Sequence, residues 1–260
     1  MPSLALWKQT LTTDFDGSSP FAGSPPFAGK EEASAPSRRF VPSGKAEVKV
    51  ILKKRKTFAV WAAQNGYDVV IFPLYVFVSK KTRNRLNELN ECLKESGLVL
   101  EAGGRDLSSL LPRRYFLFHR DYFRMEDGKR KSDHHFCATN PGAIRVIGKE
   151  GGKLFRAAGG VKVFHLWPDK GAEAAWCSCP SCRAFTAEEQ YLIGINAAAD
   201  VLAKDKPGAV VAFFETAGEG VKIPAKIPLR KNTYKIDPAT YEAELSSKNS
   251  WYSRNLEYSS

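Results

Sequence analysis

The 260-residue chain is 43% hydrophobic and 26% charged, a composition that is ordinary for a globular protein and excludes a fibrous or wholly disordered chain. It contains no run of about 18 apolar residues, so we expect no membrane-spanning helix and no membrane partner. The net charge of +11 favours acidic partners, such as nucleic acid, phosphorylated ligands or anionic glycans.

The first residues and the cysteines indicate the compartment. The chain begins MPSLALWKQTLTTDFDGSS, without a charged segment followed by an apolar core, so a signal peptide is not expected. The five cysteines are an odd number, which in a chain without an export signal favours a reducing compartment over a disulfide framework. We therefore expect a cytoplasmic protein.

Three segments differ in composition. Residues 1–44 are rich in Ser, Pro, Gly and Ala and contain the near-repeat PFAGSPPFAGK, which predicts a flexible low-complexity leader. Residues 45–215 carry regular hydrophobic patterns and are expected to form the folded domain. Residues 216–260 are polar and mixed and are expected to form a C-terminal tail.

Apolar runs and helical patterns alternate in the central segment. A helix is expected within residues 47–67, ending at Asn65 and Gly66. The next helix places three leucines on one face and is followed by Gly97. Those leucines are Leu86, Leu89 and Leu93. Four short runs rich in apolar and β-branched side chains predict buried strands at 68–75, 98–103, 161–166 and 209–215.

Capping residues mark two further helices. Asn140 precedes Pro141, and these two types suit the cap and the first position of a helix. Thr186 and Glu189 have the spacing of a capping box. That last helix is expected to bury Leu192, Ile195, Ala199 and Leu202.

The alternation of strands and helices is typical of an α/β protein with a parallel sheet and right-handed crossovers. A full eight-stranded barrel needs about 250 residues. The sequence therefore predicts a partial (β/α) TIM-like barrel, which is a half barrel with parallel strands, or a small open sheet. Such a sheet leaves edges and an apolar face uncovered, so we expect a homo-oligomer or a partner that completes it.

Candidate catalytic carboxylates lie where the predicted strands end, because ligands bind at the carboxyl ends of parallel strands. Glu101, Asp169 and Glu215 stand at or just beyond three of these ends. Two carboxylates with separated pKa values suit the general acid and the nucleophile or base at a glycosidic bond. Capping of loops or pairing with arginine is the alternative role of each acid.

Further candidates for sugar binding lie near the same ends. His165, Trp167 and Asp169 alternate with period two, which predicts that they face one side as the strand ends. A tryptophan beside an acid suits a sugar, because an aromatic ring packs against the C–H face of a pyranose. Packing in the core is the alternative for Trp167. His119 and Arg120, in the long loop before, are candidates for positioning the sugar.

Three cysteines lie close together in the sequence. Cys177, Cys179 and Cys182 form a C-x-C-x-x-C pattern that can share a metal ion, with His165 or Cys137 as a fourth ligand. Three interpretations are open: packing of small buried side chains, a structural zinc site, or a redox pair near a helix N-terminus.

Several motifs resemble a bacterial family of uncharacterised glycoside-hydrolase-like proteins. The matching stretches run from about Phe58 to Glu215 and include LEAGGRDLSSLLPRRYF, FRMEDGKR, HHFCATNP and HLWPDKG, followed by WCSCPSCRAFTAEEQ and NAAADVLA. The most specific of them are HLWPD and the C-x-C-x-x-C loop. This family is similar to the (β/α) barrels of hexosaminidases and α-glucuronidases and is mostly known as a domain of unknown function.

The resemblance implies a barrel whose strand ends form a sugar pocket. It places His165, Trp167 and Asp169 at that pocket. It also matches Glu101 to the turn of an earlier strand and Asn140 to the start of the next helix. Compared with the family, an accessory domain and the last strands are expected to be missing, as in a truncated or misframed relative of a longer barrel.

We therefore expect a glycoside-hydrolase-like protein that binds a saccharide and, if active, hydrolyses it. Asp169 would be the acid or polarising group and Glu215 or Glu101 its partner. The residues expected to position the sugar are His165, Trp167, His119, Arg120 and Asn140.

Two alternatives come from other classes of protein. One is a non-catalytic module that binds carbohydrate or another protein. The other is a basic protein that binds nucleic acid or a phosphate ligand through runs such as KKRK at 53–56. Nucleic acid is not favoured, because solvated helix faces account for such runs more often than binding does.

Overall fold

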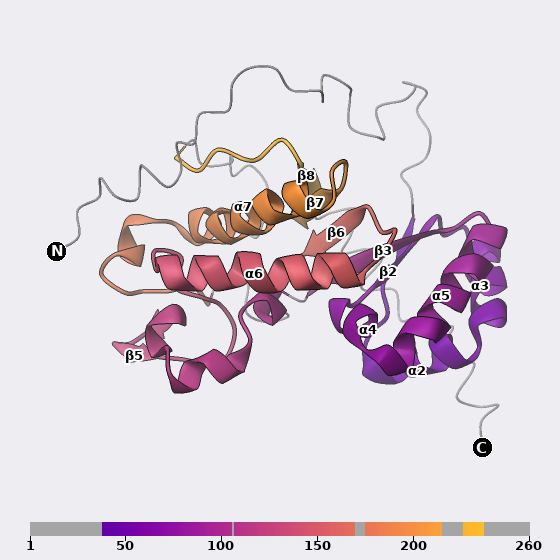
Figure 1. Ribbon diagram of the computed structural model, residues 1–260, viewed down its shortest axis with the longest axis horizontal. Coiled ribbons are helices and arrows are strands. Elements are labelled where there is room, and N and C mark those ends of the chain that lie inside the picture. Colours follow the sequence, from indigo (N-terminus) through magenta and orange to yellow (C-terminus); the bar gives the residue numbers. More distant parts are fainter. Residues whose placement is uncertain (1–37, 106, 170–174, 215–225, 237–260) are drawn as a thin grey trace. The chain divides into compact units, whose positions relative to one another are not determined.

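Six parallel strands form a curled half-barrel in the order β1-β2-β3-β6-β7-β8, with helices between them (Figure 1). The computed structural model describes residues 38–105, 107–169, 175–214 and 226–236. The α/β class and the partial barrel predicted from the alternation of strands and helices are confirmed.

The strands of the main sheet are short. They are β1 (Arg39–Phe40), β2 (Val69–Phe72), β3 (Val99–Gly104), β6 (Val163–Leu166), β7 (Val210–Phe214) and β8 (Thr233–Ile236). A separate antiparallel pair, β4 (Met125–Glu126) and β5 (Lys129–Arg130), is joined by Asp127 and Gly128. The φ angles of these two turn residues are 49° and 73°, positive values of the kind that a two-residue hairpin turn requires.

Helices follow most of the strands. They are α2 (Lys45–Lys53), α3 (Arg55–Gln64), α4 (Leu74–Val78), α5 (Lys80–Glu95), α6 (Pro141–Ala157) and α7 (Ala187–Asp205). The 3-10 helices are η1 (Leu107–Leu110), η2 (Arg113–Leu117), η3 (Arg120–Tyr122) and η4 (Cys182–Ala184). α6 and α7 run side by side (Figure 1). Their approach depends on Gly152, where a Cβ atom would lie 2.8 Å from Cγ1 of Val201.

The helix ends follow the capping residues in the sequence. The side chain of Asn140 accepts hydrogen bonds from the backbone N–H groups of Gly142 and Ala143, at 2.9 and 3.1 Å. Thr186 and Glu189 form both hydrogen bonds of a capping box at the start of α7. Gly97 follows α5 in the left-handed region, with φ of 77°. All three predicted helix ends are confirmed.

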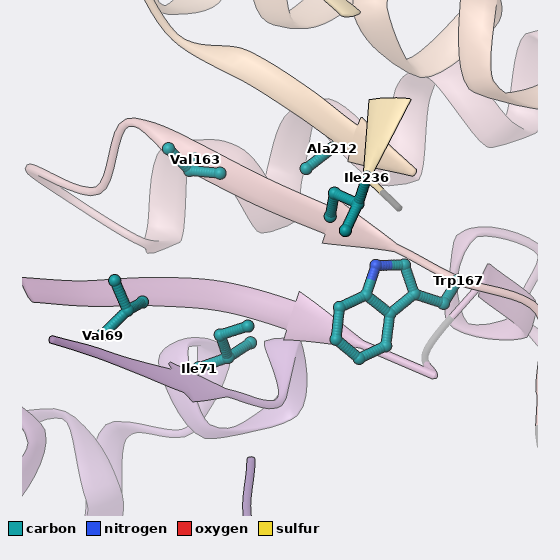
Figure 2. Close-up of a cluster of buried hydrophobic side chains, with 6 residues drawn as sticks. All are labelled: Val69, Ile71, Val163, Trp167, Ala212 and Ile236. Atoms are coloured by element: carbon teal, nitrogen blue, oxygen red, sulfur yellow. The ribbon is translucent and has the colours of Figure 1, made fainter. Parts of the chain in front are cut away.

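The two faces of the sheet bury different side chains. The outer face packs against the helices: the Phe40 ring lies 5.0 Å from that of Phe58 on α3, and the Phe164 ring lies 4.7 Å from that of Phe155 on α6. The inner face carries the hydrophobic cluster in Figure 2, which consists of Val69, Ile71, Val163, Trp167, Ala212 and Ile236. Polar groups on this inner face are therefore held in an apolar setting at the concave side of the half-barrel.

Some element boundaries differ from those expected. β2 ends at Phe72, before the expected end at residue 75, because Pro73 cannot donate to the ladder and instead precedes α4. The helix expected within 47–67 is interrupted at Lys54, whose φ and ψ of −108° and 43° are not helical. β1 and β8 add strands within 1–44 and 216–260, so regular structure extends beyond the segment 45–215 at both ends.

Candidate functional site

A buried carboxylate and an imidazole meet on the inner face of the sheet. Oε2 of Glu101, on β3, lies 2.5 Å from Nε2 of His165, on the neighbouring strand β6. The exposed fractions of these residues are only 4% and 1%. The sheet register places Gly103 opposite His165, and a Cβ atom at Gly103 would lie 1.9 Å from the His165 carbonyl oxygen. Glycine at this position therefore allows the two strands to approach.

Trp167 follows β6 and lies on the same inner face. Its ring meets that of His165 edge to face, with 5.2 Å between the centroids. In Figure 2 the indole extends from the end of β6 into the space between Ile71 and Ile236. Trp167 is fully buried, so it packs as part of the core in this structure.

Asp169 lies just past the end of β6, in a partly buried setting. Its Oδ1 atom accepts a hydrogen bond of 2.9 Å from the hydroxyl of Ser108, while Oδ2 is buried without a hydrogen-bond partner among the described residues. Burial raises the pKa of the Asp169 carboxyl above its ordinary value, against the Ser108 hydrogen bond and the nearby charges of His134 and Arg113. The carboxyl is therefore biased towards its protonated form.

The other predicted sugar-binding residues lie on the long connection between β3 and α6. His119 is exposed and stacks on Tyr122, with 4.5 Å between the ring centroids. Arg120 is also exposed, and its guanidinium lies over the ring of Phe116 at 5.6 Å. Besides capping α6, Asn140 donates a 2.7 Å hydrogen bond to the carboxylate of Asp121. The third predicted catalytic carboxylate, Glu215, lies outside the described residues.

Four buried cysteines form a second cluster. The sulfur atoms of Cys137, Cys177, Cys179 and Cys182 all lie within 4.8 Å of one another, close enough to bind a metal ion such as zinc. None of them is in a disulfide. Of the two fourth ligands considered from the sequence, the structure brings Cys137 to the other three, whereas His165 contacts Glu101.

Donor groups surround these sulfur atoms. The backbone N–H of Met125 donates to Sγ of Cys177 at 3.3 Å, and the guanidinium of Arg130 approaches the same sulfur at 3.7 Å. Hydrogen bonds among the thiols hold the pKa of Cys137 well below its ordinary value and raise that of Cys177 to about 11. The cluster therefore favours thiolate at Cys137.

Two clefts lie away from the strand ends that carry Asp169. One, of about 560 Å³, is lined by α5 and by the residues that precede β3 and β6, so it opens at the amino-terminal edge of the sheet. The other, of about 650 Å³, lies between the α2–α3 junction and α5.

Sequence reasoning missed the partners of Asp169. Ser108 and Arg113 belong to a long connection without hydrophobic periodicity, so nothing in the sequence indicated that they return to the end of β6. The hydrogen bond of Arg113 to the Ser108 carbonyl, at 2.8 Å, fixes this part of the connection. The only sequence signal was the EAGGRDLSS stretch itself, which begins in the predicted strand 98–103 and continues past its end.

No protein-family model and no curated protein matches the chain. Among solved structures, it is similar to the tandem GH20 catalytic modules of the pneumococcal exo-β-D-N-acetylglucosaminidase StrH. The TM-score is 0.50 at 12% identity, over 80% of this chain and 64% of that one. A second StrH structure, described for N-glycan recognition and hydrolysis, gives a TM-score of 0.52 at 12% identity, over 80% and 63%.

A third likeness is to the GH36 α-galactosidase AgaA of Geobacillus stearothermophilus, with a TM-score of 0.46 at 14% identity, over 68% of this chain and 27% of that one. The chain spans less than two thirds of the length of each of these structures. No helix in the described part of the chain is long and apolar enough to cross a membrane. At these identities the likeness to StrH concerns the fold alone, which is part of a (β/α) barrel.

Proposed function

We propose that the chain is a glycoside-hydrolase-like protein that binds a saccharide at the carboxyl ends of its parallel strands, with Asp169 as the acid or polarising group. The observation that carries this proposal is the buried Oδ2 atom of Asp169, which has no hydrogen-bond partner among the described residues. Buried polar atoms in folded proteins almost always have a partner. A hydroxyl group or glycosidic oxygen of a bound sugar would supply one.

Two further features support this role for Asp169. Burial raises the pKa of its carboxyl, which favours the protonated form that a general acid needs. The residue also stands where (β/α) barrels place their active sites, at the carboxyl end of a strand. Because StrH is an exo-β-D-N-acetylglucosaminidase, saccharides that end in N-acetylglucosamine are the first to test.

A hydrolase also needs a second carboxylate, for which the chain offers two candidates. Glu101 is bound to His165, so its first role is to hold that imidazole in place. Glu215 directly follows β7 in the sequence. A chain in which neither acid acts with Asp169 would bind the saccharide without hydrolysing it.

The cysteine cluster would have a structural part in this proposal. Four protein ligands complete a tetrahedral zinc site, so a zinc ion held by these four sulfur atoms would have no position left for substrate. Catalysis would therefore rest on carboxyl groups.

Binding of nucleic acid is less well supported. The basic run Lys53–Lys56 lines a cleft whose other side carries Glu88, Glu91 and Glu95 of α5, and Arg55 forms an ion pair with Glu88. These acids offset part of the positive charge that a phosphate backbone would need.

The proposal can be tested with a glycan array and with aryl glycosides, using the wild type, Asp169→Asn and Asp127→Asn. Asp127 is an exposed hairpin residue with φ of 49°, a conformation that asparagine also adopts, so Asp127→Asn is a matched control. We expect Asp169→Asn to weaken saccharide binding by roughly 10-fold, as for loss of one hydrogen bond to a buried polar group. Equal binding by both variants, or no binding by the wild type, would contradict the proposal.

A further inference from the structure

We propose that Cys137, Cys177, Cys179 and Cys182 bind one zinc ion, and that this ion fastens the connection before α6 to the connection before α7. Cys137 comes from the first connection, three residues before the cap residue Asn140. The other three cysteines come from the second, which ends at the cap residue Thr186.

The sulfur positions fit a tetrahedral ion. Zinc binds thiolate sulfur at about 2.3 Å, which places sulfur atoms at the corners of a tetrahedron about 3.8 Å apart. Sγ of Cys137 lies 3.7 Å from Sγ of Cys179 and 3.7 Å from Sγ of Cys182. A disulfide would need about 2.05 Å. The spacing therefore fits four ligands around one ion and excludes a sulfur–sulfur bond.

The surroundings suit thiolates in particular. Four thiolates around a divalent zinc carry an overall negative charge, which burial disfavours unless nearby donors offset it. Arg130 supplies a positive charge beside Cys177, and Met125 donates its backbone N–H to the same sulfur. The hydroxyl of Thr139 lies 3.2 Å from Sγ of Cys182. Binding would release the thiol protons to solvent, with no change in oxidation state.

The two donors to Cys177 come from a third part of the chain. Met125 and Arg130 belong to the β4–β5 hairpin, and the hydroxyl of Ser178 also donates to the carbonyl of Met125, at 2.8 Å. On the other side, the side chain of Gln190 on α7 accepts from the N–H of Cys177 and donates to its carbonyl, both at 3.1 Å. The C-x-C-x-x-C loop is thus held between the hairpin and α7 with its sulfur atoms facing Cys137.

A structural role follows from the ligand count. Catalytic zinc sites keep a position for water or substrate, whereas sites with four protein ligands are closed. Tetrahedral sites of four thiolates suit zinc or iron, and the soft ligands exclude magnesium and calcium.

The decisive measurement is the metal content of the full chain, purified with a reducing agent and without chelator, for the wild type, Cys137→Ser, Cys179→Ser and Cys92→Ser. Cys92 is the fifth cysteine, on α5 and outside the cluster, so Cys92→Ser is the matched control. Inductively coupled plasma mass spectrometry should find one zinc per chain in the wild type and in Cys92→Ser, and far less zinc in both cluster variants. Metal content can be measured whether or not the chain binds a saccharide.

Two measurements on the intact cluster avoid the problem that a cluster variant fails to fold. A mercurial reagent that modifies thiols should release the zinc, read with a zinc-sensitive dye. Cobalt in place of zinc should give the intense absorption bands of a tetrahedral site with thiolate-to-cobalt charge transfer. A wild type that binds neither zinc nor cobalt, cluster variants that keep zinc, a cobalt spectrum of octahedral type, or bound iron in place of zinc would each overturn the proposal.

Discussion

Glu101 and His165 lie 2.5 Å apart on neighbouring strands although 64 residues separate them in the chain. Both are buried, so neither can exchange this contact for water without exposing the core. Removing one partner therefore leaves the other with an unsatisfied polar group in an apolar setting.

The first prediction concerns this pair. Glu101→Ala should lower the free energy of unfolding by about 1–3 kcal/mol, the cost of leaving a buried group unsatisfied. Glu101→Gln keeps a side chain that can hydrogen bond and should lose less. Urea unfolding of Glu101→Ala, His165→Ala and the double variant would measure the coupling. Strictly additive losses would show that the contact does not stabilise the fold.

A second prediction separates two effects of glycine at the end of β3. Gly103 and Gly104 have φ of 117° and 119°, so alanine at either position should lose about 1–3 kcal/mol through backbone strain. Only at Gly103 would the new Cβ atom overlap the backbone of His165; at Gly104 the nearest atom is 3.9 Å away. Gly103→Ala should therefore lose roughly a further 1–3 kcal/mol. Equal losses in denaturant unfolding would be incompatible with the close approach of β3 and β6.

The third prediction concerns the ion pair between Arg124 and Asp133, which both precede Cys137 in the sequence. Asp133 accepts hydrogen bonds of 2.8 and 2.5 Å from the buried guanidinium of Arg124, which hold the pKa of that carboxyl well below its usual range. Asp133→Asn should destabilise the protein near neutral pH, because the buried guanidinium of Arg124 loses a charged partner. The loss should be only about 1–3 kcal/mol, because Asp133 itself is partly exposed.

The lowered pKa also fixes the sign of the pH dependence. The charged form of Asp133 stabilises the fold at a pH above its unfolded pKa of about 4, and that stabilisation is lost as the pH falls towards the folded pKa. The difference between the wild type and Asp133→Asn should shrink below about pH 4. Asp127→Asn, at the exposed hairpin turn, is the control and should show no such trend.

The fourth prediction is that Asp169 gives the opposite pH dependence of stability. Its pKa is raised by burial, so its charged form is disfavoured by folding. The contribution of Asp169 to the free energy of unfolding therefore falls as the pH rises from its unfolded pKa of about 4 to its raised pKa in the folded protein. Below and above this window the contribution does not change with pH. Asp169→Asn removes that loss and should gain stability relative to the wild type across the window. Unfolding curves at a series of pH values would reveal it, and a constant difference would rule out the raised pKa.

The fifth prediction tests what Asn140 does. Asn140→Ala removes the cap of α6 and should lose about 1 kcal/mol, as should Thr186→Ala at the start of α7. Asn140→Ser keeps a capping oxygen, so its stability should be near that of the wild type. If Asn140→Ser is stable and binds saccharide normally, the residue serves the helix. Loss of binding in this stable variant would instead assign it to the sugar.

Local signals in the sequence predicted α5, α6, α7 and the four central strands, but not α4 or the break between α2 and α3. Hydrophobic runs, Asn140 before Pro141, and the Thr186–Glu189 pair each act within a few residues, so they can be recognised without the fold. β1 escaped prediction because it is only two residues long and sits in a stretch rich in proline and serine. Its pairing depends on Asp68, whose carboxylate accepts the N–H of Arg38 across 30 residues of chain.

The sites were harder to predict than the fold. The period-two pattern correctly placed His165 and Trp167 on one face, but it could not supply the partner, because Glu101 reaches His165 only through the register of β3 against β6. The fourth cysteine was equally hard to predict. His165 contacts Glu101, and it is the connection before α6 that brings Cys137 to the C-x-C-x-x-C loop.

The boundary between β3 and β6 divides the sheet into two halves of three strands each. β1, β2 and β3 make one half and β6, β7 and β8 the other, and the boundary between β3 and β6 is bridged in sequence by the longest connection among the described strands of this sheet. Glu101, Gly103 and Ser108 stand on one side of this boundary, and His165 and Asp169 on the other. A small sliding or opening of one half against the other would alter all these contacts together while leaving each half internally unchanged. The geometry of the candidate site therefore depends on the alignment of β3 with β6 and not on either strand alone.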